Sequence, residues 1–317
     1  MMKIPACSII IRAYNEEQHI RRLLQGIGEQ SLQDVQIILV DSGSTDGTLA
    51  ATQGYPVEVV NILPENFTFG RSLNMGFAAA RSDLVVMASA HVYPVYPDWL
   101  EQLLAPFKDP KVGLSYGKQR GIDHSHFSEQ QIFKHWYPDS TDLHQAHPFC
   151  NNANAAIRRS LWALHPYDES LPGLEDLEWG KWAQEEGHRI AYVAEAEVIH
   201  VHGESQRGIF NRYRREGMAF KRIYPHERFG KMDLIRLFYH NVIDDLKAAQ
   251  QQKVLLRNCV PIIKFRWSQF NGTYHGYRQS GPLTWALRQA FYYPRSSSAE
   301  PGDDAKRNVE PIQYSKI

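Results

Sequence analysis

Cysteine is scarce in this sequence. The chain has 317 residues and only three cysteines, at Cys7, Cys150 and Cys259. They are odd in number and widely spaced, and no two form a Cys-x-x-Cys pair, so a disulfide framework is excluded. This usage predicts ordinary thiols in a reducing compartment.

An excess of charge of either sign is also absent. Lysine and arginine together number 35, as do aspartate and glutamate, which gives a formal net charge of zero. Without a global positive field the chain is not expected to bind nucleic acid, although a basic patch can exist within a neutral total. With 43% hydrophobic and 22% charged residues, the composition is that of a globular protein and excludes disordered and collagen-like classes.

Long apolar runs are missing. None approaches the roughly 20 residues that span a bilayer. The run near the N-terminus is short and interrupted by Arg12, unlike a signal peptide. The sequence therefore predicts a cytoplasmic protein, either soluble or held at the inner face of a membrane as a peripheral protein.

Glycine is missing from the loop after the first predicted strand, which reads RAYNEE. A dinucleotide-dependent oxidoreductase needs Gly-x-Gly-x-x-Gly at this point, and a sugar-nucleotide nucleotidyltransferase needs a glycine-rich loop there. This absence excludes both classes.

The first half does contain an alternation of β-rich and helical patterns. Strands are predicted over residues 7–12, 36–40, 57–62 and 83–88, and helices over 16–29 and 72–80. The first run is almost continuously apolar, as in a strand buried on both faces. The alternation predicts an α/β fold with a mixed, mainly parallel sheet flanked by helices.

Polar residues follow three of these strands, at 12–15, 41–44 and 89–91. Right-handed crossovers bring the carboxyl ends of parallel strands to one edge of the sheet, where ligands bind in open sheets of this type. The sequence therefore predicts a single binding site formed by these three loops.

The second half is less regular. A buried loop entering a strand is predicted over 148–158, a helix with an acidic start over 174–187 and a strand over 190–201. From about residue 211 the pattern is amphipathic and helical. We predict an α/β domain at 1–210, a helical region facing an acceptor or a membrane at 211–295, and a disordered tail at 296–317.

Five segments carry a resemblance to a known family. They read SIIIRAYNEEQHIRRLL, IILVDSGSTDGT, RSLNMGFAAARSDLVVMASA, GLEDLEW and AEVIHVHGES, and they span about residues 5 to 210 in this order. The chain resembles family 2 glycosyltransferases, which have the Rossmann-like GT-A fold. The resemblance implies inverting transfer of a sugar from a nucleotide diphosphate sugar, of UDP or dTDP type, to an acceptor hydroxyl. It also implies a role in bacterial surface glycan synthesis, with a saccharide or lipid-linked glycan as acceptor.

The resemblance implies a nucleotide site at the predicted edge. Asp41 would accept a hydrogen bond from the base or ribose, with Ala13 and Tyr14 packed beside the base. Arg71, at the start of a helix with Asn74, would meet the base or a phosphate. The full set is Arg12, Ala13, Tyr14, Asn15, Asp41, Ser42, Ser44, Arg71, Ser89 and Ala90. The alternatives are a plain turn after Asp41, a helix cap at Asn15 and a surface arginine at Arg71.

The metal site departs from the family pattern. Members usually carry Asp-x-Asp after the fourth strand, whereas this chain has Ser89-Ala90-His91. Related GT-A enzymes that begin mucin-type glycans use Asp-x-His there and add a second histidine, which would correspond to His200, with His202 close behind. Two imidazoles favour Mn²⁺ over Mg²⁺, because nitrogen suits the softer ion. The alternative is a loop histidine and a sheet-edge histidine without metal.

The resemblance implies that Asp176 is the catalytic base and Glu175 a supporting hydrogen-bond acceptor. The pair begins a predicted helix, whose positive N-terminus is expected to keep Asp176 ionised. An acidic first turn that merely suits the helix dipole is the alternative. Trp179, one turn further on, is expected either to line the acceptor pocket or to lie in the core.

Two further groups of residues have an open interpretation. Asn151, Asn152 and Asn154 would contact the donor sugar or form structural hydrogen bonds. Five histidines in an aromatic region lack a metal-ligand spacing and are assigned to an acceptor loop. These are His124, His126, His135, His144 and His147.

The helical region interleaves basic and aromatic residues, as in NRYRREGMAFKRIYPHERFGK and FRWSQFNGTYHGYR. This composition suits anionic lipid headgroups or saccharides, and a solvated helical face is the alternative. A processive polysaccharide synthase is excluded, since the chain lacks membrane spans and a Gln-x-x-Arg-Trp motif. A catalytically inactive scaffold of the same fold is the main rival, although a site without activity would not need Glu175, Asp176 and His200.

Overall fold

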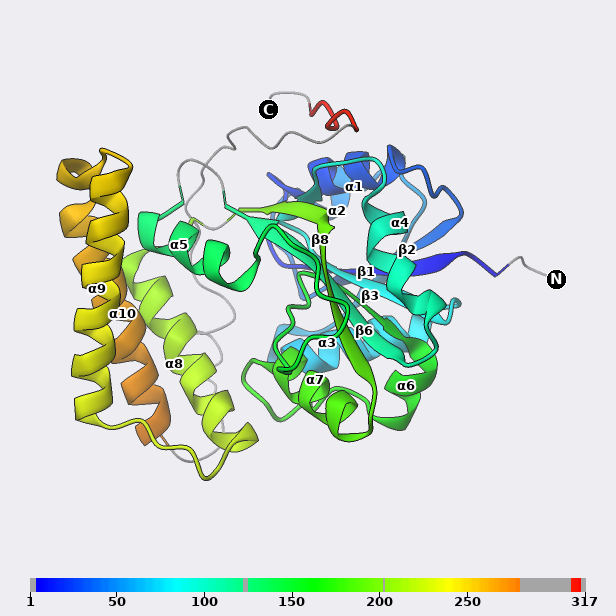
Figure 1. Cartoon of the computed structure of the whole chain (residues 1–317). Coiled ribbons are helices and arrows are strands. Elements are labelled where there is room, and N and C mark those ends of the chain that lie inside the picture. Colours follow the sequence, from blue (N-terminus) through cyan, green and yellow to red (C-terminus); the bar gives the residue numbers. More distant parts are fainter. Residues whose placement is uncertain (1–3, 122–124, 202, 280–308, 315–317) are drawn as a thin grey trace.

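The computed structural model describes residues 4–121, 125–201, 203–279 and 309–314 (Figure 1). Eight strands form one sheet in the order β3-β2-β1-β4-β7-β6-β8-β5. Their bounds are β1 Cys7–Ala13, β2 Val35–Asp41, β3 Val57–Asn61, β4 Leu84–Ser89, β5 Val92–Pro94, β6 Val112–Arg120, β7 Asn154–Arg158 and β8 Arg189–His200. The helices of this part are α1 Ile20–Gly28, α2 Thr48–Ala51, α3 Phe69–Ala79, α4 Trp99–Leu104, α5 Phe127–Trp136, α6 Arg159–Leu164 and α7 Glu175–Glu185, with 3₁₀ turns η1 Pro64–Asn66 and η2 Ala105–Lys108.

The N-terminal half of the sheet is parallel. β1 lies between β2 and β4 and runs parallel to both, and β2 pairs in parallel with β3. Successive residues of β1 point to opposite faces, so Ile9 and Ile11 enter one hydrophobic cluster and Ile10 the other. Burial on both faces explains the continuous apolar run, and the predicted α/β class is confirmed.

Two predicted helix starts differ from the structure. α1 begins at Ile20 rather than at residue 16, because Asn15 has a φ of 54° and the backbone N–H of Glu16 bonds the Thr48 hydroxyl instead of continuing a helix. α3 begins earlier than predicted, because the Thr68 hydroxyl accepts a hydrogen bond from the Arg71 N–H and caps it there.

The C-terminal half of the sheet is mixed. β7 is antiparallel to β4 and to β6, β6 is parallel to β8, and the short β5 is antiparallel to β8. The predicted helix at 174–187 corresponds to α7, and the predicted strand at 190–201 corresponds to β8.

Three long helices form a layer beside α5, at the left of Figure 1. They are α8 Gln206–Ile223, α9 Lys231–Gln251 and α10 Leu255–Arg278. The predicted boundary between residues 210 and 211 falls inside α8. The backbones of α8 and α10 approach closely because Gly272 and Gly276 face the carbonyls of Phe210 and Arg214, where a Cβ would not fit. Among the described helices, none combines the length and apolar character needed to cross a bilayer.

Residues 309–314 return to the α/β domain. The Tyr314 hydroxyl donates to the Pro94 carbonyl, and the Ile312 N–H donates to the Val95 carbonyl. The Tyr314 ring meets Tyr93 edge-on. This part of the segment predicted to be disordered therefore packs against β5, while residues 296–308 and 315–317 lie outside the described residues.

Candidate active site

The ends of three strands meet at one edge of the sheet. Asp41 lies opposite Ala13 in the β1–β2 register, and Arg12 lies opposite Ser89 in the β1–β4 register. The Ala90 N–H donates to the Arg12 carbonyl at 3.1 Å. The loops at 12–15, 41–44 and 89–91 therefore adjoin one another.

Asp41 is buried at this edge, and only one of its two carboxylate oxygens accepts hydrogen bonds within the described part of the chain. Its Oδ2 accepts hydrogen bonds from the N–H groups of Gly43 and Ser44, each at 3.1 Å. Gly43 has a φ of 88°, which glycine adopts without strain. Its Oδ1 has no hydrogen-bond partner among the described residues. An acceptor without a partner is costly in a protein interior, so this oxygen suits a ligand that donates a hydrogen bond.

The other residues of the two loops bind one another. The Asn15 N–H donates to the Ser44 hydroxyl at 2.9 Å, and the Asn15 side-chain oxygen accepts from the Thr45 N–H at 2.8 Å. The Ser42 hydroxyl donates to the Ala13 carbonyl at 3.0 Å. These contacts fix the shape of the loops, and Tyr14 lies half-buried between them.

Arg12 points toward α7. Its Nη1 donates to Glu175 Oε1 at 3.2 Å, and its guanidinium lies 5.0 Å from the centre of the Phe69 ring. Arg71 is 46% exposed and its nearest acidic partner is Glu169, at 3.9 Å. Of the two predicted arginines, Arg12 thus connects the sheet edge to the Glu175-Asp176 pair, whereas Arg71 lies at the surface.

Glu175 and Asp176 open α7. The preceding residue, Leu174, has a φ of 56°, which is uncommon for a residue with a side chain. Asp176 accepts hydrogen bonds from the N–H groups of Leu177, at 2.8 Å, and Asn152, at 3.3 Å. The strained turn and these bonds fix the position of the Asp176 carboxylate.

Burial and, after it, the adjacent Glu175 carboxylate raise the pKa of Asp176 to about 7, although the N–H donors of Leu177 and Asn152 and the charge of Arg12 act against the shift. The expectation that the helix N-terminus keeps Asp176 ionised is therefore wrong, because desolvation and a like charge outweigh the dipole. A carboxylate that titrates near neutral pH suits a general base.

His91 and His200 lie side by side. Their rings stack with centroids 5.1 Å apart and planes 20° from parallel. The Nδ1 of His91 lies 2.7 Å from Glu16 Oε1, and the Nδ1 of His200 lies 2.7 Å from Gln119 Oε1. Burial disfavours protonation of His91, but the Glu16 carboxylate outweighs it and raises the His91 pKa. His202 lies outside the described residues.

The two histidines form only part of a site for a divalent metal ion. Among the residues that the structure describes, no group of three or more His, Cys, Asp or Glu side chains is arranged to hold an ion. The two imidazoles nevertheless each have Nδ1 fixed by an oxygen, as metal-binding histidines have. They can supply two of the ligands of such an ion.

Several residues with an open interpretation have structural roles. Trp179 is fully buried in the core and donates to the His165 carbonyl at 2.9 Å. The Asn154 amide binds the carbonyl of Ala196 and the indole N–H of Trp99, so it does not face a donor sugar. The crowded asparagines thus satisfy buried backbone and side-chain groups.

A cavity of about 410 Å³ lies beside the end of α5. Its lining is Tyr116, His135, Trp136, Pro138, Asp142, Gln145, His147 and Tyr192. Trp136 is 39% exposed and stacks on Phe149 at 4.3 Å between ring centres. Cys150, which follows Phe149 in the chain, donates its thiol hydrogen to the backbone carbonyl of Asp176 at 3.2 Å. The cavity therefore presents an aromatic face and hydrogen-bonding groups.

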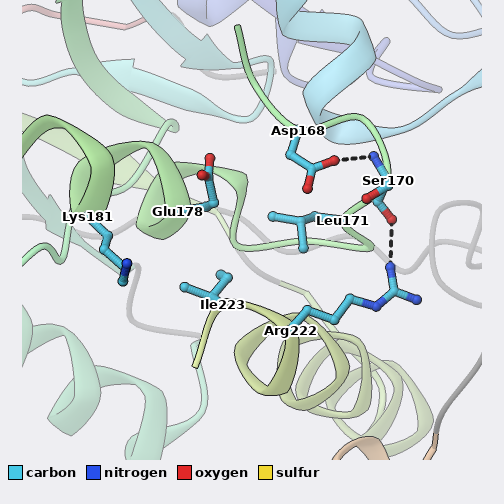
Figure 2. Close-up of a pocket in the computed structure, with 7 residues that line it drawn as sticks. All are labelled: Asp168, Ser170, Leu171, Glu178, Lys181, Arg222 and Ile223. Carbon is cyan, nitrogen blue, oxygen red and sulfur yellow. Dashed lines mark hydrogen bonds between the residues drawn. The ribbon is translucent and has the colours of Figure 1, made fainter. Parts of the chain in front are cut away.

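A second cavity of about 290 Å³ lies between α7, the end of α8 and the 168–171 loop (Figure 2). Arg222 closes one side by donating to the Ser170 carbonyl at 2.9 Å. Glu178 and Lys181 line it from α7. These two residues follow the carboxylate pair on the helix, and neither Glu175 nor Asp176 lines either cavity.

Three residues near the site were not assigned from the sequence. Glu16 and Gln119 orient the two histidines, and Arg215 on α8 lies 4.7 Å from the centre of the Phe69 ring. Asn152, whose interpretation was open, binds both Glu175 and Asp176. Only Glu16 had a local signal, the Asn-Glu-Glu sequence. The other contacts join segments far apart in the chain.

Residues 8–164 match the family model described as glycosyl transferase family 2. The O-antigen chain rhamnosyltransferase WbaN of Salmonella anatum is 29% identical over 66% of this chain and 70% of its own length. The O-antigen chain rhamnosyltransferase RfbN of Salmonella typhimurium is 27% identical over 65% of this chain and 69% of its own length.

Solved structures agree in fold. The mannosyltransferase PcManGT from Pyrobaculum calidifontis, in complex with GDP-Man and Mn²⁺, superposes with a TM-score of 0.57 over 87% of this chain and 85% of its own, at 19% identity. GalNAc-T7 with UDP, GalNAc and Mn²⁺ superposes with a TM-score of 0.54 over 75% of this chain and 51% of its own, at 15% identity. The sheet and its helices therefore have the GT-A architecture, and the chain belongs to glycosyltransferase family 2.

Proposed function

We propose that this glycosyltransferase moves a sugar from a nucleotide diphosphate sugar, of UDP or dTDP type, onto an acceptor hydroxyl with inversion, and that Asp176 is the base. The observation that carries the proposal is the position of Asp176. Support comes from its pKa, which is raised to about 7, and from the hydrogen bond of Arg12 to Glu175, which joins the start of α7 to the end of β1.

In the reaction, ionised Asp176 takes the proton of the acceptor hydroxyl as that oxygen bonds the anomeric carbon. The bond from that carbon to the diphosphate oxygen breaks on the opposite side, and the nucleoside diphosphate leaves. A positioned base contributes about 10²–10⁴-fold to such a step. Glu175, held by Arg12 and Asn152, keeps the turn before Asp176 in place.

The nucleoside binds against the loops at 12–15, 41–44 and 89–91. We assign the unpartnered Oδ1 of Asp41 to a donor group of the base or ribose. Tyr14 packs beside the base, and the backbone around Ser44 and Ser89 bounds the site. Arg71, exposed in the first turn of α3, contacts the donor only at the rim.

His91 and His200 would hold a divalent cation, Mn²⁺ in preference to Mg²⁺. Bound there, the ion would neutralise charge on the departing diphosphate. Support comes from the stacked imidazoles and their oxygen partners, and from the Mn²⁺ named with two enzymes of similar fold.

The acceptor is proposed to be a saccharide or lipid-linked glycan of the bacterial surface, as the names of the two Salmonella relatives favour. Its sugar would stack on Trp136 in the cavity of about 410 Å³, with Asp142 and His147 as hydrogen-bonding partners. A lipid-linked acceptor also implies that the enzyme works at the inner face of a membrane.

The decisive experiment compares the parent enzyme with Asp176→Asn. UDP-, dTDP- and GDP-sugars are offered with Mn²⁺, and slow donor hydrolysis and nucleotide affinity are measured. We expect hydrolysis and transfer to fall about 10²–10⁴-fold in the variant, with nucleotide affinity unchanged. Asp34→Asn, at an exposed aspartate before β2, serves as the matched control. Activity of Asp176→Asn equal to that of the control would rule out Asp176 as the base.

A further inference from the structure

Helices α9 and α10 carry large apolar side chains on their exposed faces. Eight of these side chains are between 45% and 95% exposed, namely Met232, Ile235, Tyr239, Ile243, Leu256, Val260, Ile263 and Trp267. Within each helix they recur every three or four residues, so they form a stripe along one face. Scattered exposed apolar residues are ordinary, but two stripes on neighbouring helices form a patch that marks an interaction site.

The two stripes belong to one surface, which we call the apolar face. The ring of Phe238 on α9 lies 5.6 Å from Trp267 on α10 and 5.5 Å from its neighbour Tyr239. α9 is the outermost helix in Figure 1, with the α/β domain on the far side of the layer. The apolar face therefore points away from the active site.

Basic residues border this face. Arg236, Arg257 and Lys264 each follow a stripe residue directly, and Lys247 follows Ile243 by one turn, and all four are exposed. Residues 206–278 contain 15 Lys or Arg and five Asp or Glu, a formal charge of +10, although the whole chain is neutral. The charge of the molecule is thus divided, with the positive part concentrated in the helical layer.

We propose that the apolar face is a membrane-docking surface for an anionic phospholipid bilayer. Apolar side chains between basic ones match a bilayer interface, where the first enter the acyl boundary and the second meet lipid phosphates. A second copy of the chain fits less well, because two layers of this charge would repel each other. The surface goes beyond glycosyl transfer and would bring the enzyme to a lipid-linked acceptor.

Vesicle co-sedimentation of the full chain tests this. The probes are vesicles of phosphatidylcholine alone and vesicles of equal parts phosphatidylcholine and phosphatidylglycerol. The parent should bind the second kind and lose binding at high salt. Ile243→Ser with Leu256→Ser should weaken binding about tenfold or more, since each withdraws an apolar contact. Arg257→Gln with Lys264→Gln should cost about fivefold per charge.

The matched control is Ile4→Ser with Leu164→Ser, which makes the same changes at exposed positions of the α/β domain. It should bind vesicles like the parent. Equal losses in both variants, or no binding of the parent to the anionic vesicles, would overturn the proposal. So would sedimentation velocity in which the parent is a dimer that Ile243→Ser with Leu256→Ser dissociates. None of these assays uses the active site, so their failure leaves the proposed transfer reaction standing.

Discussion

Two aspartates of this protein have the same side chain and opposite surroundings. One oxygen of Asp41 accepts two backbone N–H groups at the end of β2. Asp176 is next to Glu175 in a desolvated turn, and this raises its pKa to about 7. Environment, more than residue type, thus distinguishes the two carboxylates.

This difference predicts the pH dependence of the enzyme. Only ionised Asp176 can accept a proton, so kcat/KM should rise with pH and level off above about 7. Glu175→Gln removes the neighbouring charge and should shift this rise in kcat/KM to lower pH. A pH–rate profile of both proteins checks this, and a rise at the same pH in both would contradict it.

The same pKa shift has a consequence for stability. Because the folded-state pKa of Asp176 is raised, stability linked to this group is present at low pH and is lost as pH rises toward about 7. Asp176→Asn should therefore have a higher melting temperature than the parent at pH 8, with the difference shrinking toward pH 4. A constant difference across this range would contradict the shift.

The histidine pair is tested by removing one ring. His91→Ala should lower Mn²⁺-dependent UDP affinity by about tenfold or more, and Glu16→Gln should have a smaller effect in the same direction. Calorimetric titration with and without Mn²⁺ measures it. His165→Ala, which removes a ring stacked on Trp182, is the control. Parental Mn²⁺-dependent binding in His91→Ala would exclude His91 as a ligand.

At the scale of elements, the buried strands were predictable and the contacts between segments were not. β1 and β4 are continuous apolar runs because both of their faces are covered. β5 has three residues and exists because it pairs with β8, about 100 residues further on, which no local pattern reports. For the same reason the Glu16–His91 and Asn152–Asp176 contacts could not be predicted, although the motifs contained Glu16, His91 and Asp176.

The packing of α3 on β1 predicts how stability changes when one methyl group is added at a glycine. A Cβ on Gly76 would lie 2.6 Å from the Cγ2 of buried Ile10, so Gly76→Ala should cost about 1–3 kcal/mol through overpacking. Gly28, at the end of α1, has open space around it, and Gly28→Ala should be neutral or gain up to about 1 kcal/mol. Urea denaturation compares the two, and equal effects would contradict this packing.

At the scale of the whole molecule, the helical layer is joined to the α/β domain by charge as well as by apolar contacts. Arg212 on α8 binds Glu129 on α5 at 2.8 Å and Glu204 before α8 at 2.8 Å. Inside the layer, Arg266 makes two hydrogen bonds of 2.8 Å to Asp245, and both side chains are buried. The amphipathic pattern predicted these helices, but not the partners of their buried charges.

Breaking that buried pair should unfold the layer. Arg266→Met leaves the Asp245 charge without compensation and should cost about 3–5 kcal/mol. Adding Asp245→Leu should restore most of the loss, since an apolar pair replaces a buried ionic one. Arg236→Met, at an exposed pair with Asp233, should cost less than about 1 kcal/mol. Chemical denaturation followed by circular dichroism measures all three, and equal costs at the two arginines would contradict the account.

Residues 309–314 lie beyond the three helices in the chain and pack again on the α/β domain. A Cβ on Gly26 would collide with the Tyr314 hydroxyl, so glycine at this position of α1 leaves room for the Tyr314 side chain. Gly26→Ala would therefore displace the Tyr314 hydroxyl from the Pro94 carbonyl, and the edge of the sheet at β5 would lose the cover of this segment.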